Sequence, residues 1–133
     1  MDICYHRPLI VTACRKDISI RVWNYHQMRC DLKKQFDASN FESTDPQPLI
    51  CVSIHPNGYY LASGFVDKIR IFHLTYNDLK AYREIGLKNC NQIRFSNGGN
   101  YLACAAKTKS NNFDIYVYNS NTMELIETLK ANN

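Results

Sequence analysis

Long apolar runs and blocks of like charge are both missing from this sequence. No stretch approaches the ~20 apolar residues that a membrane-spanning helix needs, and no cationic segment followed by an apolar one opens the chain. The 16 basic and 12 acidic residues are scattered, so the net charge of +4 is not concentrated in one segment. We therefore predict no membrane contact, and nucleic-acid binding is disfavoured.

Motifs that carry enzymatic or metal chemistry are also lacking. The sequence has no Cys-x-x-Cys pair. Cys4, His6 and Cys14 could form half of a metal site only if the fold brought other ligands to them. The glycines at 98 and 99 lie in a turn rather than in a phosphate-binding loop, because no helix is predicted after them. We predict no catalytic residue, no cofactor and no metal.

The six cysteines do not indicate a disulfide framework, because the sequence shows no secretory signal. Cys14, Cys51 and Cys104 lie within alternating apolar segments, where a cysteine behaves as a small buried apolar residue. We expect a soluble protein in a reducing compartment.

Short strands separated by polar turns make up most of the chain. Residues 9–14 and 18–23 favour two strands around a break at residues 15–17, and apolar residues alternate with others along the second strand. Residues 59–74 repeat this pattern, with a predicted break at residues 64–67. The sequence therefore predicts successive β-hairpins.

The hairpins recur with a long period. Trp23, Phe72 and Tyr118 occupy the same position in three aligned strands, at intervals of 49 and 46 residues. A period of ~40 to 45 residues is typical of four-stranded propeller blades, and the surplus is accounted for by loop insertions. Residues 52–64 also match residues 93–105 without a gap, and this match aligns two turn glycines, Gly58 and Gly99. We expect both to adopt the positive φ that a tight hairpin turn needs.

Each unit is predicted to end in a more polar fourth strand, over residues 28–36, 78–85 and 123–129, as suits an outer edge. A helical turn remains an alternative for residues 78–85. The fold class predicted is all-β, with about three four-stranded antiparallel blades of a partial propeller. The expected units are repeat one 1–36, a loop 37–48, repeat two 49–85 and repeat three 90–129. The loop is either functional or a mobile surface insertion.

The segments 17–24, 54–64 and 95–103 resemble the WD-repeat family, whose units end their third strand in a Trp-Asp-like pair. The family also has an Asp in the turn before that strand. The resemblance assigns structural repeat positions to Asp17, Trp23, Asp67, Phe72, Asn112 and Tyr118. The Asn at position 112 departs from the pattern, and the Gly-His dipeptide that often opens a repeat is absent.

Residues 6–25, 55–72 and 95–103 are similar, in order and spacing, to a ciliary branch of this family. The resemblance implies a long axonemal protein with propellers followed by a coiled coil, acting in the assembly or regulation of inner dynein arms. It also implies a location in the cilium or flagellum and its cytoskeleton, and otherwise in the cytoplasm. The expected partners are further blades and dynein-arm or tubulin-associated subunits. This sequence itself contains no heptads.

Basic residues in the predicted turns form a candidate interaction face for an acidic partner, and the alternative is ordinary solvated turn chemistry. These residues are Arg15, Lys16, Lys68, Lys107 and Lys109. We predict a non-catalytic protein-interaction scaffold. The alternatives are a general adaptor of a cytoplasmic complex, an enzyme with a charged pocket at the central channel, and an RNA-binding propeller. The predicted inner strands argue against the enzyme, because besides cysteines they carry only His55 and Arg94 as titratable groups.

Overall fold

The computed structural model describes residues 1–37 and 48–130, and within these ranges it contains twelve strands and no helix. The strands are β1 Asp2–Cys4, β2 Leu9–Cys14, β3 Ser19–Asn24, β4 Arg29–Gln35, β5 Leu49–Ile54, β6 Tyr60–Phe65, β7 Ile69–Leu74, β8 Leu79–Ile85, β9 Cys90–Phe95, β10 Tyr101–Lys107, β11 Phe113–Asn119 and β12 Leu125–Leu129. The loop predicted over residues 37–48 lies almost entirely outside the described residues.

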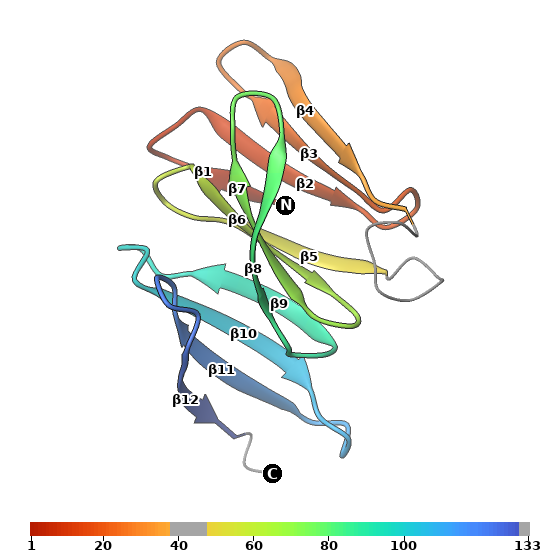
Figure 1. Cartoon of the computed structure of the whole chain (residues 1–133), viewed down its shortest axis with the longest axis vertical. Coiled ribbons are helices and arrows are strands. Elements are labelled where there is room, and N and C mark those ends of the chain that lie inside the picture. Colours follow the sequence, from red (N-terminus) through yellow and green to blue (C-terminus); the bar gives the residue numbers. More distant parts are fainter. Residues whose placement is uncertain (38–47, 131–133) are drawn as a thin grey trace.

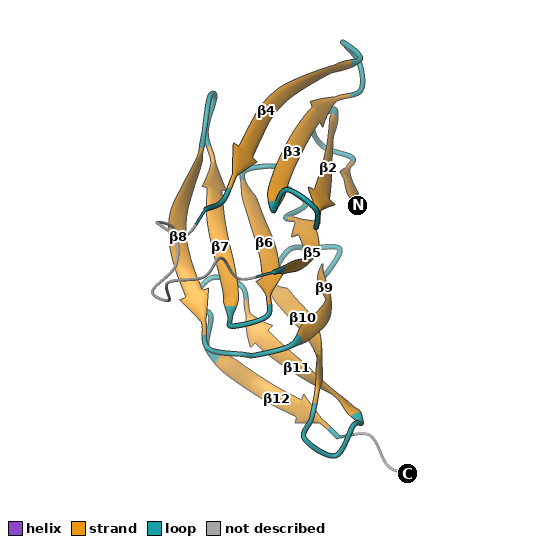
Figure 2. Cartoon of the chain, turned by 90° about the vertical axis from the view of Figure 1, so that its right-hand side faces the viewer, coloured by secondary structure: helices purple, strands orange, loops and turns teal. Residues whose placement is uncertain are grey.

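The strands form three separate four-stranded antiparallel sheets, each a meander in chain order. We name them blade 1 (β1–β4), blade 2 (β5–β8) and blade 3 (β9–β12). The blades lie side by side with blade 2 in the middle, and they do not close into a ring (Figure 1, Figure 2). The predicted fold class, a partial propeller of about three blades, is confirmed.

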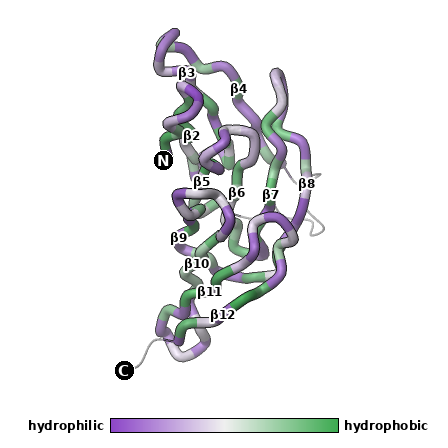
Figure 3. Tube along the Cα trace, turned by 90° about the vertical axis from the view of Figure 1, so that its left-hand side faces the viewer, coloured by the Kyte–Doolittle hydropathy of each residue, from purple (hydrophilic) through white to green (hydrophobic). Residues whose placement is uncertain are grey.

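Burial differs between the middle blade and the outer ones. Blade 2 is covered on both faces, so every residue from 61 to 65 is buried. In β10 of blade 3 buried residues instead alternate with more exposed ones, because only one face meets a neighbour. Two apolar clusters fill the blade 1–blade 2 and blade 2–blade 3 interfaces. The outer strand β8, in contrast to these apolar interfaces, is largely hydrophilic (Figure 3).

A bulge occurs at the same position in all three blades. The register between third and fourth strands shifts after Val22, after Ile71 and after Val117. The next residue in each case is the aligned aromatic one: Trp23, Phe72 or Tyr118. The structural repeat therefore follows the alignment drawn from the sequence.

The turn glycines have the predicted conformation, with a φ of 77° at Gly58 and 78° at Gly99. Each also receives a side chain from the preceding blade. The Nη1 of Arg7 donates to the Gly58 carbonyl oxygen at 2.8 Å, and the Nε2 of His55 lies 3.0 Å from the Gly99 carbonyl oxygen. The backbone amide of Asn57 donates to the Nδ1 of His55, so Nε2 is the atom that carries hydrogen.

Two details differ from the sequence predictions. Residues 79–85 are a strand, so the helical alternative is wrong; pairing with β7 outweighs the weak helical spacing there. The break predicted at residues 64–67 is also misplaced, because Gly64 and Phe65 belong to β6. A Cβ on Gly64 would lie 2.6 Å from the Cys51 sulfur, so this glycine allows two strands and a side chain to pack closely.

Candidate interaction surface

The turns between second and third strands lie on one side of the molecule, at the right in Figure 1. Backbone hydrogen bonds join them to the connections between blades. The amide of Asn89 donates to the Val66 carbonyl at 3.0 Å, and the amide of Lys107 donates to the Asn89 carbonyl at 3.2 Å. We call this side, made by residues 15–18, 66–68, 86–89 and 107–112, the basic face.

The structure places the five predicted basic residues on the basic face, but they differ in exposure and in ion pairing. Lys68 is partly buried, and its Nζ lies 2.9 Å from the carboxylate of Glu84. Arg15, Lys16, Lys107 and Lys109 are exposed. The electrostatic contribution of Lys68 to a partner is therefore reduced by its ion pair.

Sequence reasoning missed Lys88, which is exposed on the same face. It precedes Asn89, whose backbone bonds both to the Val66 turn and to Lys107. Lys88 lies in a connection between blades rather than within a hairpin turn. In a propeller these two kinds of loop share one face. Applying this rule to the predicted strand order would have placed Lys88 on the basic face.

The aligned acidic positions in blades 1 and 2 pair with aligned arginines. Asp67 accepts two hydrogen bonds from Arg70, at 2.9 and 3.0 Å, and the Asp17 carboxylate lies 3.6 Å from Arg21. In blade 3 both members are replaced, by Asn112 and by the tyrosine at the arginine position. The two positions therefore change together, which avoids a buried arginine without its carboxylate.

These contacts shift the carboxyl groups toward their charged form. A hydrogen bond from the Ser19 hydroxyl, with contributions from Cys14 and Lys33, lowers the pKa of Asp17 to about 2. Burial tends to raise the pKa of Asp67, but the hydrogen bonds and charge of Arg70 outweigh it and leave this pKa below 3.8. Both carboxylates are charged at neutral pH and offset the positive charge of the basic face.

The aligned aromatic residues pack or hydrogen-bond within the protein. Trp23 donates from Nε1 to the Thr12 hydroxyl at 2.9 Å. Phe72 and Tyr118 are buried against the preceding blade, and burial raises the pKa of Tyr118 to about 12. None of the three lies on the basic face.

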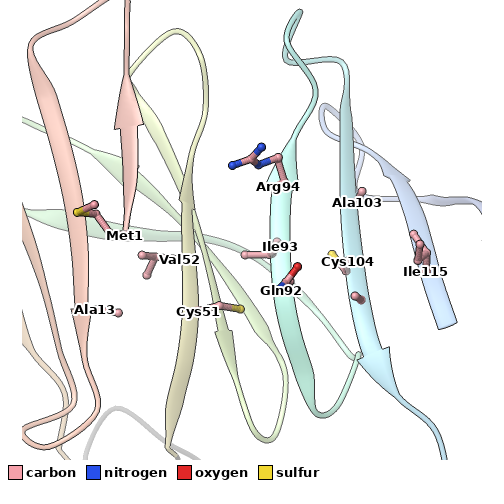
Figure 4. A pocket seen from close by; sticks show the side chains of 11 residues that line it. Met1, Ala13, Cys51, Val52, Gln92, Ile93, Arg94, Ala103, Cys104 and Ile115 are labelled. Atoms are coloured by element: carbon pink, nitrogen blue, oxygen red, sulfur yellow. The ribbon is translucent and has the colours of Figure 1, made fainter. Parts of the chain in front are cut away.

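A hollow of about 680 Å³ runs along the inner strands and is lined partly by thiols (Figure 4). Contact with the Cys104 thiol, together with burial, raises the pKa of Cys90 to about 12. The Cys90 thiol and burial likewise raise the pKa of Cys51. Thiols with raised pKa values remain protonated and are poor nucleophiles. His55 makes its hydrogen bonds to backbone groups rather than to any of these cysteines.

Metal ligands do not converge in the described part of the chain. Over residues 1–37 and 48–130, no group of three or more His, Cys, Asp or Glu side chains is placed to hold a metal ion. In the same ranges, no helix is long and apolar enough to cross a membrane.

Comparison with known proteins agrees with this architecture. A family model described as WD domain, G-beta repeat matches residues 39–69. The chain is 32% identical over 131 residues to cilia- and flagella-associated protein 57 of Mus musculus, a match that covers 98% of this chain. The chain belongs to the WD-repeat family.

Other WD-repeat relatives are found in Tetrahymena thermophila. Its cilia- and flagella-associated protein 57 C is 37% identical over 84% of this chain, and its protein 57 A is 31% identical over 87%. The chain spans 9% of the mouse relative and 8% of each Tetrahymena relative. The matched region is therefore a small part of those proteins.

Solved structures with low sequence identity share the fold. Kuenenia stuttgartiensis hydrazine synthase aligns with a TM-score of 0.77 at 12% identity, over 99% of this chain and 35% of that one. The Myceliophteria thermophila Cps50 (Swd1) β-propeller domain aligns with a TM-score of 0.63 at 15% identity, over 93% of this chain and 40% of that one. At these identities the likeness concerns the β-propeller fold alone.

Proposed function

We propose that this chain is part of a ciliary WD-repeat scaffold that binds protein partners and acts in the assembly or regulation of inner dynein arms. The observation that carries the proposal is the match to relatives named cilia- and flagella-associated protein 57, over 84 to 98% of the chain. The repeat units 1–36 and 49–85, with the loop 37–48 between them, and the repeat unit 90–129 would each supply one blade. Axonemal location and dynein-arm partners are the specific content of the proposal.

The surface chemistry supports an acidic partner. Lys88, Lys107 and Lys109 are exposed on the basic face, and backbone hydrogen bonds hold the turns that carry them next to one another. A cluster of exposed cations attracts acidic segments and speeds their encounter. The acidic tails of tubulin or an acidic axonemal subunit would fit this surface.

The inner hollow supports a scaffold rather than an enzyme. The thiols of Cys51 and Cys90 have raised pKa values, and both ring nitrogens of His55 are engaged with backbone groups. A nucleophile and its base need to lie within hydrogen-bond reach of each other. These side chains do not make that arrangement.

Location is tested by tagging the full natural protein at its own locus in a ciliated cell and then removing it. We expect the tagged protein along the axoneme, and we expect its removal to reduce inner dynein arms in electron tomograms. A uniform cytoplasmic signal with intact inner arms would instead support a general cytoplasmic adaptor.

The basic face is tested by charge reversal in the full natural protein, with Lys107→Glu and Lys109→Glu combined. We expect weaker co-sedimentation with microtubules, and no further loss when the acidic tubulin tails have been removed by protease. Lys80→Glu, compared with each single substitution, is the control, because Lys80 is exposed on β8, away from the basic face. Equal binding by all variants would refute this face. Salt-sensitive binding to single-stranded RNA in place of microtubules would support the RNA-binding alternative.

A further inference from the structure

A second surface lies between blades 2 and 3 on the side opposite the basic face. There a pocket of about 270 Å³ is lined by four rings, those of His55, Tyr60, Tyr82 and Phe95. The turns that carry Asn57 and Asn121 form its polar rim. The proposed scaffold function makes no use of this pocket.

The rings contact one another in sequence and form a continuous aromatic wall. The centroid of His55 lies 5.0 Å from that of Phe95 and 6.1 Å from that of Tyr60, with both pairs close to edge-to-face. Tyr60 lies 5.2 Å from Tyr82 and also stacks on His73 at 5.1 Å. Packed rings have few accessible rotamers, so the wall is preorganised for a ligand.

The polar groups of the pocket include side chains that are free to donate hydrogen bonds. In the described part of the chain, no group hydrogen-bonds to the hydroxyls of Tyr60 and Tyr82. The Oδ1 of Asn57 accepts from the Tyr59 amide at 2.8 Å, which leaves its NH₂ group available to donate. The Asn121 side chain is exposed beside it.

The charges disfavour a cationic ligand. None of the described residues that line the pocket carries a formal charge, so no carboxylate is present there to attract a cation. The guanidinium of Arg83 already lies 5.1 Å from the centre of the Tyr82 ring, and its Nη1 donates to the Thr122 carbonyl at 3.1 Å. A second cation at this ring would face like charge.

We propose that this pocket binds a proline-rich segment of a partner protein in the polyproline II conformation. Proline rings are apolar and flat enough to lie against tyrosine rings, and aromatic-lined grooves recognise such segments. Proline has no N–H, and a polyproline II helix has no internal hydrogen bonds, so the ligand presents carbonyl acceptors alone. These carbonyl oxygens can accept hydrogen bonds from the side chains of Tyr60, Tyr82 and Asn57.

The test uses the full natural protein and a fluorescently labelled synthetic oligoproline peptide, with binding followed by anisotropy. We expect saturable binding, and no binding of a glycine–serine peptide of equal length. Tyr82→Ala should weaken binding about tenfold or more, as loss of an aromatic anchor usually does. Tyr82→Phe keeps the ring and removes one donor, so it should weaken binding by only about two- to tenfold.

Tyr101→Ala is the matched control. Tyr101 is 51% exposed and Tyr82 is 46% exposed, but Tyr101 does not line the pocket. Its replacement should leave the affinity unchanged. Lys107→Glu combined with Lys109→Glu should also leave it unchanged, which separates this site from the basic face.

Two results would overturn the proposal. The first is oligoproline binding that is absent, or that is equally strong in Tyr82→Ala and in the unaltered protein. The second is binding of tetramethylammonium that is lost in Tyr82→Ala without any peptide binding, which would assign the pocket to organic cations.

Discussion

Single side chains connect neighbouring blades at the turns between first and second strands. His55 of blade 2 lies against Gly99 of blade 3, as Arg7 of blade 1 lies against Gly58 of blade 2. The glycine meets two requirements at each contact, because it supplies a positive φ and leaves room for the side chain of the preceding blade. Gly86 meets neither requirement, since no atom lies within 4 Å of its Cβ position and its φ is not positive.

Gly99→Ala should therefore destabilise the interface between blades 2 and 3. Positive φ at a residue with a side chain costs about 1 kcal/mol, and the new methyl group would also displace the His55 ring. Hydrogen-exchange mass spectrometry on the full natural protein should show faster exchange in β5 and β9. Gly86→Ala is the control and should leave exchange in these strands unchanged; equal effects of the two substitutions would contradict this account.

The ion pair of Asp67 with Arg70 is a second contact at the residue scale. Arg70 is only 7% exposed, so Asp67→Asn removes a carboxylate from beside a buried charge. We expect a loss of about 1 to 3 kcal/mol, moderated by the partial exposure of Asp67. Adding Arg70→Tyr reproduces the pair found in blade 3 and should recover part of the loss, as measured by urea unfolding of the full natural protein.

The same pair gives a pH dependence with a definite sign. The pKa of Asp67 is lower in the folded protein than its ordinary value of 3.8. The pair therefore contributes fully above pH 3.8, and its contribution is lost as the pH falls through the lowered folded value. The stability difference between the unaltered protein and Asp67→Asn should shrink on acidification below pH 3.8. A difference that grew on acidification would contradict the assignment.

At the scale of the blade, equivalent residues have different surroundings. Ile20, Ile69 and Ile115 occupy one aligned position, on the face that each blade turns toward the next. Ile20 and Ile69 are 0% exposed because blades 2 and 3 cover them. Ile115 is 42% exposed, because no described blade lies over that face. The difference in exposure therefore depends on whether a neighbouring blade is present and not on the strand that carries the isoleucine.

Comparing Ile69→Ala with Ile115→Ala tests whether another blade covers blade 3 in the natural protein. Ile69→Ala should cost about 2 to 5 kcal/mol in urea unfolding. If the face is covered in the full natural protein, Ile115→Ala should cost a similar amount there. A cost below about 0.5 kcal/mol, typical of surface positions, would show that blade 3 is a free flank in the natural protein.

At the scale of the whole molecule, the three blades form an open arc. Closed propellers use about four to eight blades, so three leave two flanks uncovered. Phe113, Ile115 and Leu129 are exposed on the flank of blade 3, and Ile3 is exposed on that of blade 1. If a few hundred Å² of apolar surface stay exposed on each flank, the protein loses on the order of ten kcal/mol of hydrophobic stabilisation. That loss is comparable with the net free energy of unfolding of a whole domain.

Residues 1–133 expressed alone should therefore aggregate, behave as a molten state or associate obligately. Size-exclusion chromatography with light scattering and thermal unfolding measure this directly. A monodisperse monomer with a sharp cooperative transition would contradict the partial-propeller account of stability. Extension by further blades should restore such a transition.

The sequence by itself determined the repeat. Alternating apolar residues, recurrent aromatic positions and the turn glycines Gly58 and Gly99 are local features, because strand and turn preferences depend on a few neighbouring residues. They were enough to predict the fold class and the position of most hairpins. They failed for Gly64, which local rules assigned to a turn although packing against Cys51 places it in a strand.

Only the tertiary structure decided which side chains meet between blades and between the turns and strands of one blade. The aromatic wall joins His55, Tyr60 and Tyr82 of blade 2 to Phe95 of blade 3, and the ion pair of Lys68 with Glu84 joins a turn to an outer strand. The shared position of Lys88 and Lys107 on one face likewise follows from how the connections between blades fold back. These contacts depend on strand register and on the angle between blades, and neither quantity is encoded in the spacing of residues along a single strand.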